Sequence, residues 1–151
     1  MENPKICIVG LGYVGLPLAT AFSEKFQVIG FDINIKRIQE LKKNIDKTHE
    51  VEKKVLESLG DKLKLTAEIK DIINCNIYII TVPTPIHKSN RPNLSPLIKS
   101  SKMVGKVLNK EDIVIYESTV YPGVTEDICV PELEKSSGLK YNKDFFCGYS
   151  P

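Results

Sequence analysis

Short apolar runs alternate with amphipathic segments along the whole chain. The runs are rich in Ile and Val, which is typical of buried parallel strands. The segments between them place apolar residues three or four positions apart with Lys and Glu between, which is typical of helices that cover a sheet. Strands are predicted over 5–10, 26–33, 63–66, 76–83, 112–119 and 144–151. Helices are predicted over 13–23, 34–44, part of 46–60, a short segment through Ile73, 95–108, and a segment that ends near Ser137 and Gly138.

This alternation predicts an α/β fold, a doubly wound parallel sheet of about six strands. Six parallel strands joined by five crossovers match the Rossmann (dinucleotide-binding) strand order 3-2-1-4-5-6. At 151 residues the chain has the size of one domain. No internal repeat, low-complexity tract or linker interrupts the pattern, so a single domain over 1–151 is expected.

The run from Ile6 to Ser23 carries no charge and has several interpretations. It is about 18 residues long, the lower limit for a membrane-spanning helix. A secretory signal would need a basic leader, and MENPK at 1–5 is a poor one. The run also changes halfway from a β-branched strand to glycines and then to a helix-like segment, with Pro17 in or near its first turn. We therefore favour strand, turn and helix, and expect no membrane segment.

Three glycines in this run, Gly10, Gly12 and Gly15, have G-x-G-x-x-G spacing. The motif is weak alone, but here it follows a strand, opens a helix, and precedes by about 20 residues an acid at the end of the next strand, Asp32. Gly10 would allow a tight turn, Gly12 the approach of a pyrophosphate, and Gly15 close packing of helix on strand. The helix N-terminus would hold the phosphates. Asp32 would accept hydrogen bonds from the adenosine ribose and repel a 2′-phosphate, which predicts NAD rather than NADP.

A second interpretation of these residues needs no ligand. In it the glycines ease a tight turn, and Asp32 caps the helix that follows. Lys36 and Arg37 come soon after Asp32 and could attract a phosphate. We expect instead that Arg37 lies along the adenine side of a bound cofactor while Asp32 sets the cofactor choice.

Hydroxylated residues follow two further strands. Thr84 comes after the strand over 76–83, and Ser118 and Thr119 end the strand over 112–119. Ligands of an open α/β sheet bind beyond the carboxyl ends of its strands. Thr84 and Thr119 are therefore the leading candidates for contacts with the nicotinamide half, and Ser118 is the third. Each hydroxyl could instead only cap a turn.

Composition and charge change this picture little. Hydrophobic residues make up 42% and charged residues 26%, as in ordinary folded proteins. The net charge is +2 without a block of like charge, so neither nucleic acid nor an anionic membrane is expected as a partner. The chain has four cysteines and two histidines: Cys7, Cys75, Cys129, Cys147, His49 and His87. These residues show no metal-ligand spacing, so we expect no metal site. Nothing suggests secretion, so we expect the thiols to be reduced and the protein to be cytoplasmic.

Four motifs carry a resemblance to a known family. They are GLGYVGLPLA at 10–19, VPTP at 82–85, ESTVYPGVTE at 117–126 and GYSP at 148–151. Together they resemble the N-terminal domain of the UDP-glucose/GDP-mannose dehydrogenase family over essentially the whole chain. The stretch over 118–151 is most similar to bacterial UDP-N-acetylhexosamine 6-dehydrogenases of surface-polysaccharide synthesis, those of the Vi-antigen type among them.

The resemblance implies an oxidoreductase that turns the C6 hydroxyl of a UDP-N-acetylhexosamine into a carboxylate. Two hydride transfers to two NAD⁺ would do this, with a cysteine holding the thiohemiacetal and thioester, in capsule or surface-polysaccharide synthesis. Thr119 matches the family's water- and proton-handling threonine and is the one catalytic residue expected here. The cofactor-binding residues expected from motif and resemblance together are Gly10, Leu11, Gly12, Tyr13, Val14, Gly15, Asp32, Arg37, Thr84, Ser118 and Thr119.

The chain also departs from the family. No cysteine stands in the G-G-S/A-C-F-P-K-D context of the family's nucleophile, and the family's glutamate after GYSP is not present. We therefore expect a truncated, NAD-binding part of a longer homodimeric enzyme, without the central helix and the UDP-sugar-binding domain that would take the substrate. Alone, this part should bind NAD weakly and should not turn over substrate. The alternatives are a 6-phosphogluconate or β-hydroxyacid dehydrogenase domain, against which VPTP and STVYPG speak, and a non-catalytic dinucleotide-binding module.

Overall fold

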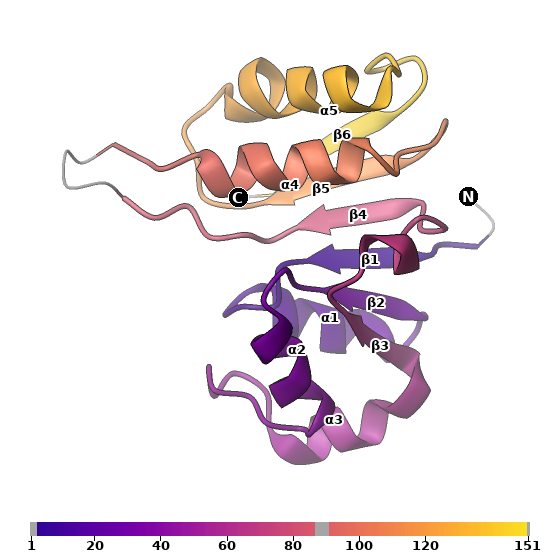
Figure 1. Ribbon diagram of the computed structural model, residues 1–151, viewed down its shortest axis with the longest axis vertical. Helices are drawn as coiled ribbons and strands as arrows, with labels where there is room; N and C mark the ends of the chain where they lie inside the picture. Colours follow the sequence, from indigo (N-terminus) through magenta and orange to yellow (C-terminus); the bar gives the residue numbers. More distant parts are fainter. Residues whose placement is uncertain (1–2, 87–90, 151) are drawn as a thin grey trace.

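The computed structural model describes residues 3–86 and 91–150, which form one parallel sheet with helices on both faces (Figure 1). The strand order is β3-β2-β1-β4-β5-β6, which confirms the predicted doubly wound fold. The strands are β1 (Ile6–Val9), β2 (Val28–Phe31), β3 (Leu63–Thr66), β4 (Ile77–Ile80), β5 (Ile113–Glu117) and β6 (Phe146–Ser150). The helices are α1 (Gly15–Ser23), α2 (Ile35–Lys42), α3 (Lys53–Leu59), α4 (Ser95–Gly105) and α5 (Val130–Ser137).

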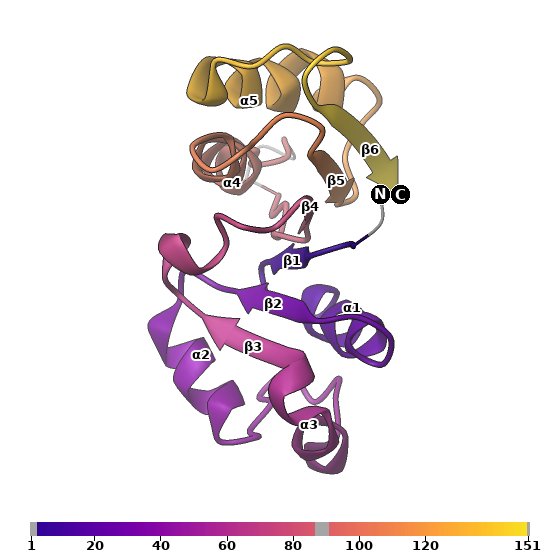
Figure 2. The same ribbon diagram turned by 90° about the vertical axis from the view of Figure 1, so that its right-hand side faces the viewer.

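The sheet separates two hydrophobic cores. Side chains of a strand alternate between its faces, so Ile6 and Ile8 of β1 enter one core while Cys7 and Val9 enter the other. The first core also contains buried residues of α1, α2 and α3, and the second contains those of α4 and α5. Figures 1 and 2 both place α4 and α5 side by side over the β5–β6 half of the sheet.

The uncharged run divides as the sequence predicts. β1 ends at Val9, the glycines form the turn, and α1 begins at Gly15 with Pro17 in its first turn. The interpretation as strand, turn and helix is therefore confirmed. Among the described residues, no helix has the length and apolar character that crossing a membrane requires.

Two elements are shorter than the apolar pattern predicts: α4 ends at Gly105 rather than 108, and β4 ends at Ile80 rather than 83. The segment over 46–60 is helical in part, as predicted, with α3 over Lys53–Leu59. Residues 46–51 form a turn in which the Asp46 carboxylate accepts backbone N–H groups, so they do not join α3. Gly60, with a φ of 50°, ends α3. Pro83 has no N–H with which to extend β4. Pro151 and His87 lie outside the described residues.

Helices α4 and α5 touch at a glycine. A Cβ added at Gly105 would lie 2.6 Å from the Cβ of Ser136 and 3.1 Å from the carbonyl oxygen of Leu133. We expect Gly105→Ala to lower the free energy of unfolding by about 1–3 kcal/mol, the usual cost of overpacking. Urea denaturation of Gly105→Ala, Ser136→Gly and the double variant measures it. Because Ser136→Gly removes the clashing atom, the double variant should be more stable than the sum of the single effects predicts; strict additivity would contradict this contact.

Candidate functional site

The predicted site residues gather at one edge of the sheet. The arrowheads of β1 and β4 point to the same edge in Figure 1, because all the strands are parallel. The glycine turn follows β1, and Asp32 follows β2. Thr84 lies beyond β4, and Thr119 lies beyond β5. The fold therefore brings together four segments that are far apart in the sequence.

The three motif glycines occupy three different environments. Gly10 has a φ of 99°, which side-chain-bearing residues rarely adopt. A Cβ at Gly15 would lie 1.8 Å from the carbonyl oxygen of Gly10, so only glycine lets α1 begin against the turn. A Cβ at Gly12 would meet no protein atom within 4 Å. Gly12 therefore presents bare backbone to an open face, which fits the close approach of a pyrophosphate.

Backbone donors surround this open face. In the described parts of the chain, the N–H groups of Gly12, Tyr13 and Val14 donate to no protein acceptor. Val14 is the N-cap of α1, and neither a capping side chain nor an acidic residue stands at that end of the helix. Unsatisfied N–H groups and the positive end of the helix dipole together favour an anion. The turn can therefore hold phosphate oxygens through its backbone.

Asp32 is built into the glycine turn. Its Oδ2 accepts a hydrogen bond from the N–H of Leu11 (2.9 Å), and its Oδ1 accepts one from the N–H of Asn34 (2.8 Å). The residue that caps α2 is Asn34, whose Oδ1 accepts from the N–H groups of Lys36 and Arg37. The part of the ligand-free interpretation in which Asp32 caps that helix is therefore wrong. A carboxylate has about four lone-pair directions, so Asp32 keeps acceptor capacity for ribose hydroxyls.

Arg37 contacts the same turn from the other side. Its Nε donates to the carbonyl oxygen of Leu11 (2.9 Å), and one terminal nitrogen lies 2.8 Å from Oδ1 of Asp46. Burial alone would raise the pKa of Asp46, but hydrogen bonds from Thr48 and Val51 and the nearby guanidinium hold it well below its ordinary value. Asp46 is therefore a buried carboxylate that stays charged and keeps Arg37 in place.

The two threonines at the other end of the site are joined. The Thr84 hydroxyl donates to the carbonyl oxygen of Thr119 (3.1 Å), which links the loops after β4 and β5. The buried Ser118 donates to the carbonyl oxygen of Val82 (3.1 Å), so its hydroxyl already has a structural partner. A hollow of about 260 Å³ opens beside Thr119 at the same edge. Its lining residues are Val120, Tyr121, Pro122, Gly123, Thr125, Glu126 and Tyr149.

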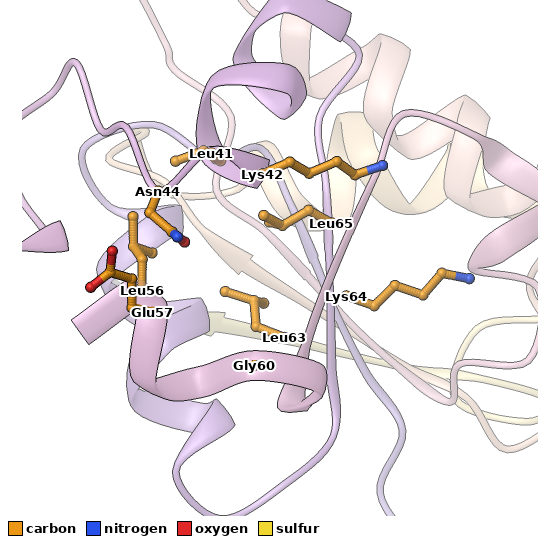
Figure 3. A pocket seen from close by; sticks show the side chains of 9 residues that line it. All are labelled: Leu41, Lys42, Asn44, Leu56, Glu57, Gly60, Leu63, Lys64 and Leu65. Atoms are coloured by element: carbon orange, nitrogen blue, oxygen red, sulfur yellow. The ribbon is translucent and has the colours of Figure 1, made fainter. Parts of the chain in front are cut away.

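A larger hollow, of about 460 Å³, lies away from this edge, against the outer strand β3. Figure 3 shows leucine side chains around its centre, with the ammonium groups of Lys42 and Lys64 extended away from them. Lys64 reaches Asp71 instead, 3.3 Å away. Asn44 and Glu57 also line this hollow, but it lies apart from the glycine turn and the two threonines.

Among the described residues, the cysteines and the other metal-binding residue types show no metal site. Burial raises the pKa of the Cys129 thiol and raises that of Cys147 to about 12. Cys75 neighbours Cys7 and precedes β4, at the opposite edge of the sheet. Within residues 3–86 and 91–150, no three His, Cys, Asp or Glu side chains are grouped as metal ligands.

Two positioning residues escaped the sequence analysis, Asp46 and Thr81. The buried Thr81 hydroxyl lies 2.6 Å from the carbonyl oxygen of Gly10, to which it donates, and 3.2 Å from that of Val9. It thereby fixes the turn from β4. A threonine near the carboxyl end of the predicted strand over 76–83 was the available signal, but only the pairing of β1 with β4 gives it a partner.

Thr81→Val tests this contact, because valine keeps the shape and removes the hydroxyl. We expect a loss of about 1–3 kcal/mol in the free energy of unfolding, since the Gly10 carbonyl oxygen then loses its buried donor. NAD affinity should fall as well. Thermal and urea denaturation, with Thr81→Ser as the control that restores the donor, measure the effect. Equal stability of the valine and serine variants would contradict the assignment.

Comparisons with known proteins agree with this geometry. The sequence model of the UDP-glucose/GDP-mannose dehydrogenase family, NAD binding domain, matches residues 4–151. UDP-N-acetyl-D-glucosamine 6-dehydrogenase of Pseudomonas aeruginosa is 56% identical over 151 residues, which are 100% of this chain and 36% of that protein. Protein CapL of Staphylococcus aureus is 55% identical over 149 residues, 99% of this chain and 35% of that protein.

Solved structures give the same picture. The UDP-D-ManNAc dehydrogenase of Pyrococcus horikoshii superposes with a TM-score of 0.89 at 33% identity, over 97% of this chain and 36% of that one. The ternary complex of GDP-mannose dehydrogenase from Pseudomonas aeruginosa has a TM-score of 0.89 at 28% identity, over 97% of this chain and 35% of that one. The chain thus spans about a third of the length of the relatives that it matches.

Proposed function

Because this chain belongs to the UDP-glucose/GDP-mannose dehydrogenase family, we propose that it is the NAD-binding domain of a nucleotide-sugar 6-dehydrogenase. The enzyme would oxidise the C6 hydroxyl of a UDP-N-acetylhexosamine to the carboxylate, using two NAD⁺. The observation that carries the proposal is the bare backbone of Gly12, set among free N–H groups at the start of α1. The 56% identity of this chain to a UDP-N-acetyl-D-glucosamine 6-dehydrogenase supports the substrate class.

In the proposed arrangement, the chain binds NAD along the carboxyl edge of the sheet. The N–H groups of residues 12–14 hold the pyrophosphate, and Asp32 accepts hydrogen bonds from the adenosine ribose. The exposed side chain of Ile33, next to Asp32, offers an apolar surface to the adenine. Thr84 and Thr119 then lie beside the nicotinamide half, where the bound cofactor supplies the hydride acceptor.

Thr119 is the residue we assign to catalysis within this chain. Its carbonyl oxygen accepts a hydrogen bond from the Thr84 hydroxyl, and the lining of the 260 Å³ hollow beyond β5 begins at the next residue, Val120. A hydroxyl there can orient a water molecule or pass a proton beside the reacting sugar carbon. Ser118 would contribute to the wall of the site rather than to proton transfer, because its hydroxyl is directed to Val82.

The remaining parts of the proposal concern the whole enzyme. We propose that residues 1–151 form one NAD-binding domain and that the UDP-sugar domain corresponds to the other two thirds of the relatives' length. We also propose a cytoplasmic homodimer that serves capsule or surface-polysaccharide synthesis, for which the similarity to Protein CapL is the support.

Two measurements test the proposal. Calorimetric titration of this chain should show that it binds NAD⁺, and NADP⁺ more weakly. Tighter binding of NADP⁺ would contradict the role of Asp32 in cofactor choice. A chain of the relatives' full length, assayed against UDP-GlcNAc, UDP-GalNAc, UDP-ManNAc and UDP-glucose, should form two NADH per sugar oxidised. The 151 residues alone should form none. No NADH with any of the four sugars would reject the substrate class and leave a dinucleotide-binding module.

A further inference from the structure

Both backbone polar groups of Leu11 are hydrogen-bonded. Its N–H donates to Oδ2 of Asp32, and its carbonyl oxygen accepts from Nε of Arg37. The Leu11 side chain is fully buried, so packing restrains the residue in addition to the two backbone hydrogen bonds. Leu11 stands between Gly10 and Gly12, and its orientation therefore sets how the bare backbone of Gly12 faces a ligand.

Arg37 is in turn held by Asp46, whose side chain is 1% exposed. Oδ1 of Asp46 also accepts hydrogen bonds from the hydroxyl and the N–H of Thr48, at 2.7 and 3.0 Å. Oδ2 accepts from the N–H groups of Glu50 and Val51, at 2.9 and 3.0 Å. Asp46 is thus saturated by the turn between α2 and α3, and its position leaves Arg37 little freedom.

We propose that Asp46 is a positioning and specificity-determining residue of the cofactor site. By holding the Arg37 guanidinium on the Leu11 carbonyl, it fixes the glycine turn and denies that cation to a 2′-phosphate. The inference rests on the proposed placement of the adenosine ribose at Asp32. An arginine near that ribose is the usual means by which Rossmann domains accept NADP, and Arg37 lies five residues after Asp32. Its ion pair with Asp46, where the Arg37 side chain is only 11% exposed, keeps it from that role.

Asp46→Asn tests the inference, because asparagine keeps the shape and removes the charge. Calorimetric titration with NAD⁺ and NADP⁺ should show weaker binding of NAD⁺ and a fall of about tenfold in the ratio of the NADP⁺ to the NAD⁺ dissociation constant. Hydrogen exchange at the Leu11 amide, followed by mass spectrometry or NMR, should become faster. The matched control is Asp144→Asn, a turn aspartate that accepts from the N–H of Lys140 far from the glycine turn. It should change neither quantity.

Two further variants keep the test decisive. Thr48→Val removes one hydrogen bond to Asp46 and should shift the ratio in the same direction by a smaller factor, which serves if Asp46→Asn folds poorly. In an Arg37→Gln background, Asp46→Asn should leave the ratio unchanged, because the cation it releases is gone. A persistent shift there would overturn the inference.

The two proposals fail differently. A wild-type chain that binds neither dinucleotide rejects the proposed function, and this inference with it. A wild-type chain that binds NAD⁺, together with an unchanged ratio in both Asp46→Asn and Thr48→Val, rejects the role of Asp46 and leaves the proposed function standing.

Discussion

Gly12→Ala is expected to weaken NAD⁺ binding severely while leaving the fold intact. The added methyl group meets no protein atom within 4 Å, so the folded chain accommodates it. The space it enters is that over which the pyrophosphate would approach the backbone. Overpacking of about 1–3 kcal/mol there corresponds to a rise of about fivefold to about 150-fold in the dissociation constant. Calorimetry with NAD⁺ and urea denaturation of the same sample separate the two effects.

The matched variant is Gly15→Ala, only three residues away. Its Cβ would lie 1.8 Å from the carbonyl oxygen of Gly10 and 2.4 Å from Oγ1 of Thr81, and neither can move without breaking the β1–α1 turn. We expect a loss of at least about 3 kcal/mol in the free energy of unfolding, at the upper end for overpacking. Unchanged NAD⁺ affinity in Gly12→Ala, or equal stability of the two variants, would contradict the division of roles.

The fold could be predicted from the sequence because its signals are local. Buried parallel strands and amphipathic helices have distinct periods, and five crossovers of one hand leave few possible strand orders. The glycine spacing and Asp32 are also local signals, so they predicted the candidate cofactor site at the end of the first two strands. The structure then joined Thr84 to Thr119, which the rule for strand ends had put at the same edge.

The parts that escaped prediction depend on tertiary contacts. The predicted strand order puts β4 beside β1, but it does not say which atoms of the two strands meet, and only the structure gives the Thr81 hydroxyl its acceptor at Gly10. The pattern over 46–60 predicted a partly helical segment, whereas the Asp46 carboxylate organises its first residues as a turn around Arg37. Such contacts depend on how distant segments pack in the fold, which the periodicity along the chain does not report.

The second large effect is expected at Asp32, and it has two separable parts. Asp32→Ala removes the acceptor for the adenosine ribose and also leaves the N–H groups of Leu11 and Asn34 without their partner. Hydrogen bonds to a charged group contribute about 1.5–3 kcal/mol, so the NAD⁺ dissociation constant should rise by about tenfold to about a hundredfold. NADP⁺ should lose less affinity, because the variant also removes the carboxylate that repels a 2′-phosphate.

Asp32→Asn separates the parts, because it keeps the shape and one acceptor oxygen while it removes the charge and replaces the second acceptor with an NH2 donor. If charge sets the cofactor choice, Asp32→Asn should shift the ratio of NADP⁺ to NAD⁺ affinity nearly as far as Asp32→Ala does, while disturbing the Leu11 amide less in hydrogen exchange. The exposed Asp61, in the turn after α3, provides the control Asp61→Asn. Unchanged NAD⁺ binding in Asp32→Ala would mean that the carboxylate serves the glycine turn alone, and cofactor choice would then have to lie with Arg37.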